Sequence, residues 1–547
     1  MRTLLQRLAP LVALAALVAV GLVCRGPVPI DETRYTAVAW EMWLRGDVLV
    51  PHLNGAPYSH KPPLLFWLIN ALWAWLGVHD WVPRLVPALA AAASLLLTGT
   101  LARTLWPDDP GTRVRAPWLL LGSLYVALFA TFLMFDLLMT ACVLVGLIGL
   151  ARAWRAWRGG WTLFALGIGF GVLTKGPAVL VYLLPAALAA PWWATAPRPL
   201  AWRRWYRALG LAVLAGAALA LAWAIPAAVL GGEEYRHAIL WGQTAGRMVK
   251  SFAHQRPWWW YLPVLPAILL PWALWPRFWQ ALLGRLRAGL GAGERFCLAW
   301  LLPGLLVFSA ISGKQVHYLL PLLPAVALLI ARGLGDLEPA GPLAARIGAW
   351  LLVLPYALLG VALALAPLLA VRQGWPAWVG EVSPLWGVLL AAVALAWPWL
   401  LARGDAVPRL PLLTVLCGVL VYAGPIRAAA PTLDGAPLAA RIGERQQAGQ
   451  PVAHPGKYHG EFQFAGRLAA PLVLIPSGGE LDWARAHPDG ALVLRHTRLS
   501  PEQRAAARYT QPYRQRHAVL WDARTLLEHP EFLAGEDAPV DAADDTE

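Results

Sequence analysis

The sequence predicts a polytopic α-helical membrane protein with a small α/β domain near its C-terminus. Of its 547 residues, 59% are hydrophobic and only 14% are charged, whereas about a quarter of the residues in a soluble domain are charged. Apolar runs long enough to cross a bilayer recur from residue 8 to about residue 424. These observations exclude a soluble globular enzyme. The composition becomes mixed and polar after Pro425, which predicts the separate domain.

The apolar runs predict about thirteen membrane spans. The first run follows Arg2 and Arg7, as a secretory signal would, but the many later spans favour an uncleaved anchor. The predicted spans lie near residues 8–24, 82–106, 116–131, 134–151, 161–174, 176–193, 208–229, 258–276, 296–312, 317–333, 347–370, 384–402 and 409–425.

The basic residues predict how these spans are oriented. The chain has 45 basic and 31 acidic residues, and all but five of the basic ones are arginine. If the N-terminus is cytoplasmic, the arginine-rich loops fall on the cytoplasmic side, as the positive-inside rule requires. The positive charge therefore indicates topology, and nucleic-acid binding is not expected. All five lysines fall on the outer side, which suggests another use: Lys61, Lys175, Lys250, Lys314 and Lys457.

We expect a transmembrane domain over residues 1–425 with two long outer segments. Residues 25–84 contain tryptophan-rich amphipathic stretches, typical of helices that lie in the membrane interface. Residues 231–257 form the second, charged segment. Residues 426–535 contain short β-like runs and turn signals, which predict a periplasmic domain of the α/β type. Residues 536–547 are expected to be an acidic tail.

Acidic residues at two outer positions are candidates for chemistry. Asp31 and Glu32 directly follow the first span, where low-dielectric walls can perturb a carboxylate that acts as a base or binds a cation. A structural role is the alternative, since Asp31 or Thr33 could cap a helix that begins near Tyr35. Asp136 lies in a short outer turn, where an acid is either functional or a helix cap.

Positively charged residues occur at several span mouths on the same side. Tyr58 and Lys61 occupy a proline-bounded turn, where the lysine could hold a phosphate or extend toward lipid headgroups. Lys175 lies in a tight turn with few polar neighbours in the sequence. This indicates an anionic partner, either a side chain or a lipid phosphate. Lys314 and His317 enter a later span from outside, and the Gly-Lys pair there lacks the rest of a nucleotide-binding motif.

The outer cations and acids together suit a lipid-linked phosphate held at the interface while a carboxylate activates an attacking group. A transporter or lipid flippase is an alternative of another class. Such proteins commonly have inverted repeats and charges at mid-span, whereas the charges here gather at one face. A non-catalytic scaffold would leave the outer cluster unexplained.

Several short motifs, taken in order, resemble one group of membrane enzymes. They are Asp31-Glu-Thr-Arg34-Tyr35, Gly46-Asp47 with Val50-Pro51-His52, Tyr58-Ser-His-Lys61-Pro62, Leu173-Thr-Lys175-Gly176, and Gly313-Lys314 through Tyr318-Leu-Leu-Pro321. Their order and spacing resemble the GT-C membrane glycosyltransferases, specifically the bacterial branch of lipid A 4-amino-4-deoxy-L-arabinose transferases and protein O-mannosyltransferases. The resemblance covers residues 1 to about 335 and, in span count and outer domain, the rest of the chain.

The resemblance implies a polyprenyl-phosphate-linked sugar donor and transfer on the periplasmic side of the bacterial inner membrane, with no cofactor required. It implies that Asp31 is the catalytic carboxylate, with Glu32 beside it, and that Asp136 is a second acid near the acceptor. It also implies a set of residues that holds the carrier phosphate: Arg34, Tyr58, Lys61, Lys175, Arg247 and Tyr318, with Lys314 and His317 as possible additions.

The sequence departs from this family in the residue before Lys61. The aminoarabinose transferases usually carry an acid there, which helps to bind a structural zinc ion with a histidine of the second long segment. Here the residue is His60, which could still ligate zinc together with His237 or His254. This change weakens the argument that the chain uses the same sugar and the same acceptor as the aminoarabinose transferases.

The expected reaction is a single inverting displacement, in which the acceptor attacks the anomeric carbon and polyprenyl phosphate leaves. The expected acceptor is lipid A or another envelope lipid or glycan, and the sugar is 4-amino-4-deoxy-L-arabinose or another pentose or hexose. The nearest alternative is a protein O-mannosyltransferase with a polypeptide acceptor. The sequence does not decide between these acceptors.

Overall fold

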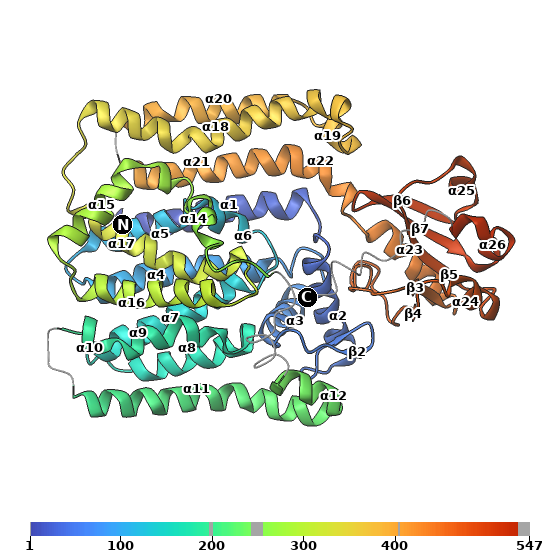
Figure 1. The fold of residues 1–547 in the computed structure, drawn as a ribbon, viewed down its shortest axis with the longest axis horizontal. Helices are drawn as coiled ribbons and strands as arrows, with labels where there is room; N and C mark the ends of the chain where they lie inside the picture. Colours follow the sequence, from blue (N-terminus) through green and yellow to red (C-terminus); the bar gives the residue numbers. More distant parts are fainter. Residues whose placement is uncertain (1, 196–200, 242–254, 403–404, 534–547) are drawn as a thin grey trace.

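A computed structural model describes residues 2–195, 201–241, 255–402 and 405–533. Long helices run side by side in layers, and the C-terminal sheet lies beyond one end of this bundle, next to α2 and α3 (Figure 1). This arrangement confirms the predicted fold class, a helical membrane protein with a small α/β domain near the C-terminus.

Nine helical segments among the described residues are long and apolar enough to cross a membrane. The helices of the bundle are α1 (Arg2–Cys24), α4 (Leu85–Leu105), α5 (Pro110–Leu121), α6 (Leu124–Phe129), α7 (Asp136–Trp154), α8 (Gly160–Lys175), α9 (Val179–Leu188), α10 (Ala190–Trp193), α11 (Trp202–Leu230), α12 (Gly232–His237), α14 (Tyr261–Ile268), α15 (Pro276–Ala288), α16 (Ala292–Ala310), α17 (Leu323–Gly335), α18 (Pro342–Gln373), α19 (Ala377–Glu381), α20 (Leu385–Ala402), α21 (Ala406–Val421) and α22 (Arg427–Ala429).

Several of the predicted spans are not single continuous α-helices, and the span at 317–333 begins with the 3-10 segment Val316–Leu322 before α17. The run at 116–131 is divided between α5 and α6 at Gly122, where a Cβ atom would lie 2.6 Å from the ring of Trp272. The run at 176–193 is divided between a 3-10 turn, α9 and α10. The run at 258–276 gives α14 and a 3-10 turn, because repeated prolines remove amide donors and interrupt the helix.

Glycines allow α7 and α8 to pack closely. A Cβ on Gly167 would lie 2.6 Å from the Cα of Gly146, and a Cβ on Gly149 would lie 2.5 Å from the carbonyl oxygen of Gly160. Only glycine permits this approach of two helix backbones. The close packing places the start of α7, at Asp136, against the end of α8, at Lys175.

The first long outer segment forms α2 (Asp31–Arg45), a short hairpin of β1 (His52–Leu53) and β2 (Ala56–Pro57), and α3 (Leu64–Leu76). The two predicted amphipathic stretches are therefore helices. Arg84, just before α4, donates to the carbonyl oxygens of Gly21 and Leu22 at 3.1 Å, which fixes α4 to the end of α1. The segment is consequently a platform that belongs to one end of the bundle.

The C-terminal part folds around a five-stranded sheet in the order β4-β3-β5-β7-β6. Strands β3 and β4 pair in parallel, as do β3 and β5, whereas β5, β7 and β6 pair antiparallel. The elements are α23 (Ala436–Gln447), β3 (Val452–Pro455), β4 (Val473–Ile475), α24 (Glu480–Ala486), β5 (Ala491–His496), α25 (Pro501–Ala506), β6 (Tyr509–Tyr513), β7 (Arg516–Asp522) and α26 (Ala523–Glu528).

This sheet unit docks on α2 through aromatic and polar contacts. The indole of Trp40 donates to the carbonyl oxygen of Leu468 at 3.0 Å, and its ring lies 6.1 Å from that of Phe464. The side chain of Asn54 donates to the carbonyl oxygen of Leu472 at 3.0 Å and accepts from its amide at 2.8 Å. The docking surface is thus the platform that begins at Asp31.

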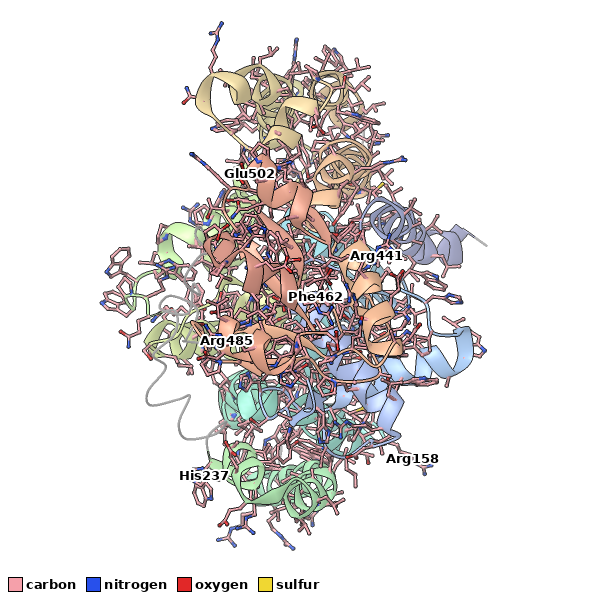
Figure 2. The ribbon with its side chains drawn as sticks, turned by 90° about the vertical axis from the view of Figure 1, so that its right-hand side faces the viewer. Arg158, His237, Arg441, Phe462, Arg485 and Glu502 are labelled. Atoms are coloured by element: carbon pink, nitrogen blue, oxygen red, sulfur yellow. The ribbon has the colours of Figure 1, made fainter. Side chains whose placement is uncertain are left out.

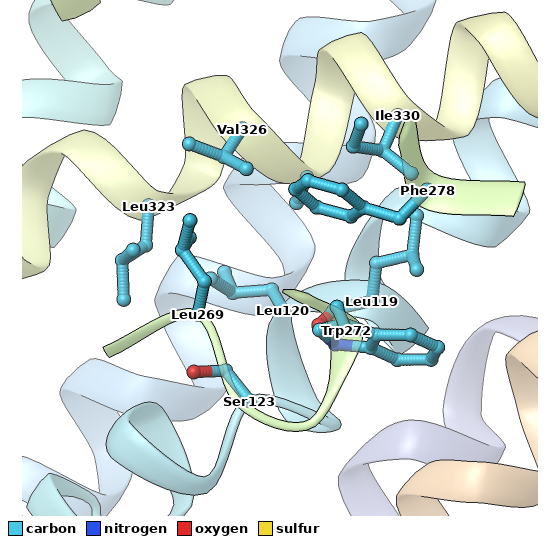
Figure 3. A pocket seen from close by; sticks show the side chains of 10 residues that line it. Leu119, Leu120, Ser123, Leu269, Trp272, Phe278, Leu323, Val326 and Ile330 are labelled. Atoms are coloured by element: carbon cyan, nitrogen blue, oxygen red, sulfur yellow. The ribbon is translucent and has the colours of Figure 1, made fainter. Parts of the chain in front are cut away.

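Arginines form ion pairs at the opposite end of the bundle. Arg332 pairs with Asp109 at 2.8 Å, and Arg285 pairs with Glu294 at 2.5 Å. Nearby, a cavity of about 20 Å³ lies between α5, α17 and the 3-10 turn at Trp272 (Figure 3). A space of this size holds about one water molecule, so it is a packing gap and not a substrate site.

Candidate active site

Asp31 opens α2 and is held by two side chains of the same turn. Its carboxylate accepts hydrogen bonds from the guanidinium of Arg34 and from the Tyr35 hydroxyl, the latter at 3.2 Å. The side chain of Asp31 is 38% exposed, whereas that of Arg34 is only 7% exposed. The N-cap of α2 is Ile30, so Asp31 does not serve as the cap. The geometry leaves an oriented carboxylate that is accessible to a reactant.

Arg34 carries a firmly held positive charge beside this carboxylate. Burial alone would lower the pKa of the guanidinium, but the nearby oxygens of Tyr58, Tyr35 and Asp31 more than offset this effect and raise it. The pKa of the Tyr35 hydroxyl is raised well above its usual value, first by burial and then by Asp31. Tyr35 therefore remains a neutral donor to Asp31.

Glu32 has a different environment from its neighbour. It is 1% exposed and pairs with Arg25 at 2.5 Å. Its carboxylate also accepts from the amides of Val28 and Leu133, each at 2.6 Å. These contacts tie the start of α2 to the loop before α7. The structure gives Glu32 a positioning role, and its contacts offer no support for the predicted catalytic one.

Lys175 and Asp136 form a buried ion pair. The Lys175 ammonium donates to Oδ1 of Asp136 at 2.7 Å and lies 4.8 Å from the ring centroid of Tyr318. Asp136 is 2% exposed, and its Oδ2 accepts no hydrogen bond from any described residue. The sequence left two kinds of anionic partner open for Lys175, a side chain or a lipid phosphate. The structure shows a side chain, that of Asp136.

Aromatic contacts join the two acidic positions. The ring of Tyr35 meets that of Phe135 edge-on at 4.9 Å, and Phe135 is the residue before Asp136. Lys61 and His317 both interact electrostatically with Asp136. The residues concerned come from α2, the turn before α3, α7, α8 and the 3-10 segment Val316–Leu322. They lie within one region at the end of the bundle where the platform sits (Figure 1).

Tyr58 is 5% exposed, and its ring lies 5.2 Å from that of His60 and 6.2 Å from that of Phe66. This packing fixes the turn that carries Lys61. Arg247 lies outside the described residues, so its place in the predicted phosphate set stays a prediction.

The described residues provide no group of three histidine, cysteine or acidic side chains that could hold a metal ion. His237 is exposed on α12, at the margin of the molecule in the end-on view (Figure 2). His254 lies outside the described residues. The donor set of the described part does not fit zinc, and the predicted zinc site stays a prediction that depends on His254.

Lys314 does not have the environment predicted for a phosphate ligand. It is 2% exposed, and its ammonium donates to the carbonyl oxygens of Ile311 and, at 2.9 Å, Arg256. It therefore joins the residues just before α14 to the residue that follows α16. His317 lies closer to the candidate site, with its ring 5.0 Å from that of Tyr318.

Two residues that contribute to the site, Tyr35 and Arg25, had no role assigned from the sequence. Tyr35 lies one helical turn after Asp31, so the i, i+4 spacing could have identified it as a partner. Arg25 could not be paired with Glu32 by spacing, because their contact depends on the loop before α7, where the carbonyl oxygen of Thr131 accepts from Arg25 at 2.8 Å.

Comparisons with known proteins show which family and fold the chain has. The family model described as dolichyl-phosphate-mannose-protein mannosyltransferase matches residues 60–229. The undecaprenyl phosphate-α-4-amino-4-deoxy-L-arabinose arabinosyl transferase of Pseudomonas aeruginosa is 35% identical over 394 residues, which cover 70% of this chain and 67% of that protein. The enzyme of the same name from Pectobacterium carotovorum is 34% identical over 400 residues, which cover 68% and 69%.

The chain belongs to the undecaprenyl phosphate-α-4-amino-4-deoxy-L-arabinose arabinosyl transferase family. The crystal structure of ArnT from Cupriavidus metallidurans bound to undecaprenyl phosphate superimposes with a TM-score of 0.73 at 20% identity. It covers 93% of this chain and 96% of that one. The similarity therefore extends over the bundle, the platform and the C-terminal sheet unit, and it confirms the GT-C fold.

Proposed function

We propose that this member of the arabinosyl transferase family moves a sugar from a polyprenyl-phosphate donor to lipid A or another cell-envelope acceptor. The observation that carries the proposal is the exposed carboxylate of Asp31, held by Arg34 and Tyr35 at the same end of the bundle as the Lys175 and Asp136 pair. The printed names of its relatives specify undecaprenyl phosphate and 4-amino-4-deoxy-L-arabinose, which makes these the first donor to test.

The donor phosphate is proposed to bind among Arg34, Lys61 and Lys175, with hydroxyls from Tyr58 and Tyr318 and with Arg247. Lys175 already lies against Asp136 and the face of Tyr318, so its ammonium is oriented before the phosphate arrives. Because the leaving phosphate gains negative charge, preoriented cations in a low-dielectric site stabilise the transition state more than the ground state.

The reaction is a single displacement with inversion. The acceptor oxygen forms a bond to the anomeric carbon as the bond from that carbon to the phosphate oxygen breaks. The electron pair of the broken bond stays on polyprenyl phosphate. Asp31 receives the proton of an acceptor hydroxyl or, if the acceptor is an anionic phosphate, orients it. No step in this scheme needs a metal or an organic cofactor.

The site is proposed to face the periplasm, in a protein of the inner membrane with a cytoplasmic N-terminus. The ion pairs of Arg332 and Arg285 lie at the other end of the bundle, which is the side that the positive-inside rule assigns to the cytoplasm. The sheet unit then lies in the periplasm, beside the platform.

A protein O-mannosyltransferase is the second candidate, and the family model that matches residues 60–229 favours it. That match includes Lys61, Asp136 and Lys175 but not Asp31. A flippase remains the candidate of another class, and it predicts movement of the lipid without transfer of the sugar.

A transfer assay distinguishes these candidates. Purified protein in liposomes receives a panel of radiolabelled undecaprenyl-phosphate sugars, and the label is measured separately in the lipid, polysaccharide and protein fractions. Label in the lipid fraction supports the proposal and identifies the sugar. Label in the protein fraction supports the second candidate, and no transfer from any donor contradicts both.

A further inference from the structure

The parallel strands of the C-terminal sheet unit separate at their carboxyl ends. From β3 the chain passes to β4 on one side, and from β4 it returns past β3 to β5 on the other side. Within residues 405–533, β3 and β5 pair only at Val452 and Ala453. Beyond these residues β3 continues to Pro455 and β5 to His496. In open α/β sheets, ligands bind outside the carboxyl ends of the strands, at the point where the order of the strands reverses.

A buried carboxylate lies at this separation, on the face of the sheet that α23 covers. Val452 and Val493 pack with α23 in one apolar cluster. Because alternate residues of a strand point to the same face, Arg495, two residues after Val493, belongs to that face. The loop after β3 brings in Glu461, whose side chain is 1% exposed and whose carboxylate accepts from Arg495 at 2.7 Å.

Two guanidinium groups share one oxygen of Glu461. Arg495 donates to Oε1, and a guanidinium nitrogen of Arg514, in the turn between β6 and β7, lies 3.9 Å from the same atom. Burial alone would raise the pKa of Glu461, but neighbouring groups, Arg495 first among them, more than offset this effect and lower it to about 2. The carboxylate is therefore ionised, and it balances only one of the two arginine charges.

Both arginines are accessible from outside. Their side chains are 28% and 31% exposed, whereas Glu461 is buried beneath them. A guanidinium presents several N–H donors in a planar fork, which matches two oxygens of a phosphate. Residues 491–516 contain one acidic residue, Glu502, and six arginines: Arg495, Arg498, Arg504, Arg508, Arg514 and Arg516. This excess of positive charge attracts anions to the pair.

Two buried donors of this cluster have no hydrogen-bond acceptor among the described residues. They are the hydroxyl of Tyr513, a residue that is 1% exposed, and Nε of Arg495. The guanidinium of Arg495 lies 5.9 Å from the ring centroid of Tyr513, and Tyr513 interacts electrostatically with Glu461 and Arg514. A buried donor without an acceptor is costly. The two groups therefore indicate an occupant that accepts hydrogen bonds.

The cluster lies where the sheet unit joins the rest of the molecule. The amide of Arg514 donates at 2.8 Å to the carbonyl oxygen of Thr432, in the connection that leaves α22. The loop that carries Glu461 also reaches α2, where the side chain of Gln463 donates to the carboxylate of Glu41 at 3.4 Å. The pair is consequently placed near the platform, at the outer end of the bundle (Figure 1).

We propose that Arg495 and Arg514 form a binding site for a phosphate monoester, carried either by a soluble sugar or by the headgroup of a membrane lipid. The two guanidinium groups bind the phosphate oxygens, the Tyr513 hydroxyl donates to one of them, and Glu461 holds the guanidinium groups in place. A phosphate monoester has a charge of about −1.5 to −2 at pH 7, which suits the surplus positive charge. None of the residues proposed for the donor phosphate belongs to this unit, so the inference does not depend on the proposed function.

Protection from an arginine-specific reagent tests the site in the wild-type protein. Phenylglyoxal modifies accessible arginines, and mass spectrometry of the digested protein gives the rate at each position. In detergent, glucose 1-phosphate at ten times its Kd should slow modification of Arg495 and Arg514 about tenfold. The rate at Arg485 should not change, because this residue is 64% exposed on α24, which packs on the opposite face of the sheet (Figure 2).

Two substitutions should change the affinity in opposite directions. Arg514→Gln removes a charged donor from a half-exposed turn and should raise the Kd for glucose 1-phosphate, measured by titration calorimetry, about tenfold or more. Glu461→Gln removes the competing negative charge and should lower the Kd. Arg485→Gln is the matched control and should leave it unchanged. Equal Kd values for wild type and Arg514→Gln would overturn the inference and would leave water as the occupant beside Tyr513.

Nanodiscs distinguish the two sources of the phosphate. Phosphatidylcholine nanodiscs that contain phosphatidic acid should protect Arg514 from phenylglyoxal if the ligand is a lipid headgroup, whereas phosphatidylcholine alone should not. Protection by glucose 1-phosphate but not by phosphatidic acid assigns a soluble sugar phosphate, and protection by both assigns the phosphate group whatever carries it. Protection by neither would overturn the inference. Since none of these measurements records sugar transfer, their failure would leave the proposed function standing.

Discussion

Replacing Lys175 by alanine removes an ammonium that lies 2.7 Å from Asp136 and 4.8 Å from the Tyr318 ring. It leaves the Asp136 carboxylate buried without its partner. Breaking a buried ion pair costs about 3 to 5 kcal/mol. We expect about 3 kcal/mol here, because the Lys175 side chain is 16% exposed and the site admits some water. The variant should therefore unfold at a lower temperature than the wild type.

The same replacement should also weaken donor binding. A charge-assisted hydrogen bond contributes about 1.5 to 3 kcal/mol, which corresponds to about 10- to 100-fold in donor KM. The double variant Lys175→Ala with Asp136→Ala separates the two effects, since it removes both charges. Stability should largely return in the double variant, whereas the donor KM should remain high.

Two assays on the same preparations decide the matter: thermal unfolding in detergent, followed by tryptophan fluorescence, and transfer at varied undecaprenyl-phosphate sugar concentration. A donor KM that returns to normal in the double variant, together with stability, would refute the phosphate role of Lys175. It would then be only the structural partner of Asp136.

Three further predictions concern separate parts of the molecule. Lys314→Met should lower stability by about 1 kcal/mol, because the half-buried carbonyl group of Ile311 and the carbonyl group of Arg256 lose their donor, and should leave donor KM unchanged; a tenfold rise in KM would restore Lys314 to the phosphate set. Burial lowers the pKa of His454 to about 4, so the folded chain keeps this imidazole neutral while the unfolded chain binds a proton below pH 6.5. Stability should then fall by about 2 kcal/mol from pH 7 to pH 5, and chemical unfolding of His454→Gln should lack this component. Treatment with a chelator should leave transfer unchanged, whereas loss that zinc restores would support the zinc site.

The sequence predicted the fold well where local patterns decide it. The runs that became α4, α7, α8, α11 and α20 are long, apolar and bounded by charged or turn residues, so length and composition were sufficient. The run at 258–276 misled because an apolar composition alone does not show that prolines interrupt the helix. At Gly122 the ring of Trp272, a residue distant in sequence, leaves no room for a Cβ atom, and the sequence alone could not show this contact.

The candidate site shows the same division. The sequence indicated Asp31, Asp136 and Lys175 because each is charged and lies at the end of a predicted membrane span. An ionisable group there is costly unless it is paired or functional. The pairing of Asp136 with Lys175 was beyond the sequence, since it depends on the close packing of α7 and α8. Lys314, like Lys175, is a lysine beside a glycine at the end of a predicted span. Its ammonium nevertheless donates to backbone carbonyl oxygens and not to a carboxylate.

We propose that Asp31 is the carboxylate that activates the acceptor. Asp31→Asn keeps the size of the side chain and a group that accepts from Arg34 and Tyr35, but it removes the base. The most direct measurement is the rate of sugar transfer by wild type and Asp31→Asn in liposomes at saturating donor, with equal amounts of folded protein. For a hydroxyl acceptor the account predicts a fall in kcat of about 100-fold or more with little change in donor KM. With such an acceptor, an Asp31→Asn variant that retains most of the wild-type kcat would contradict this role.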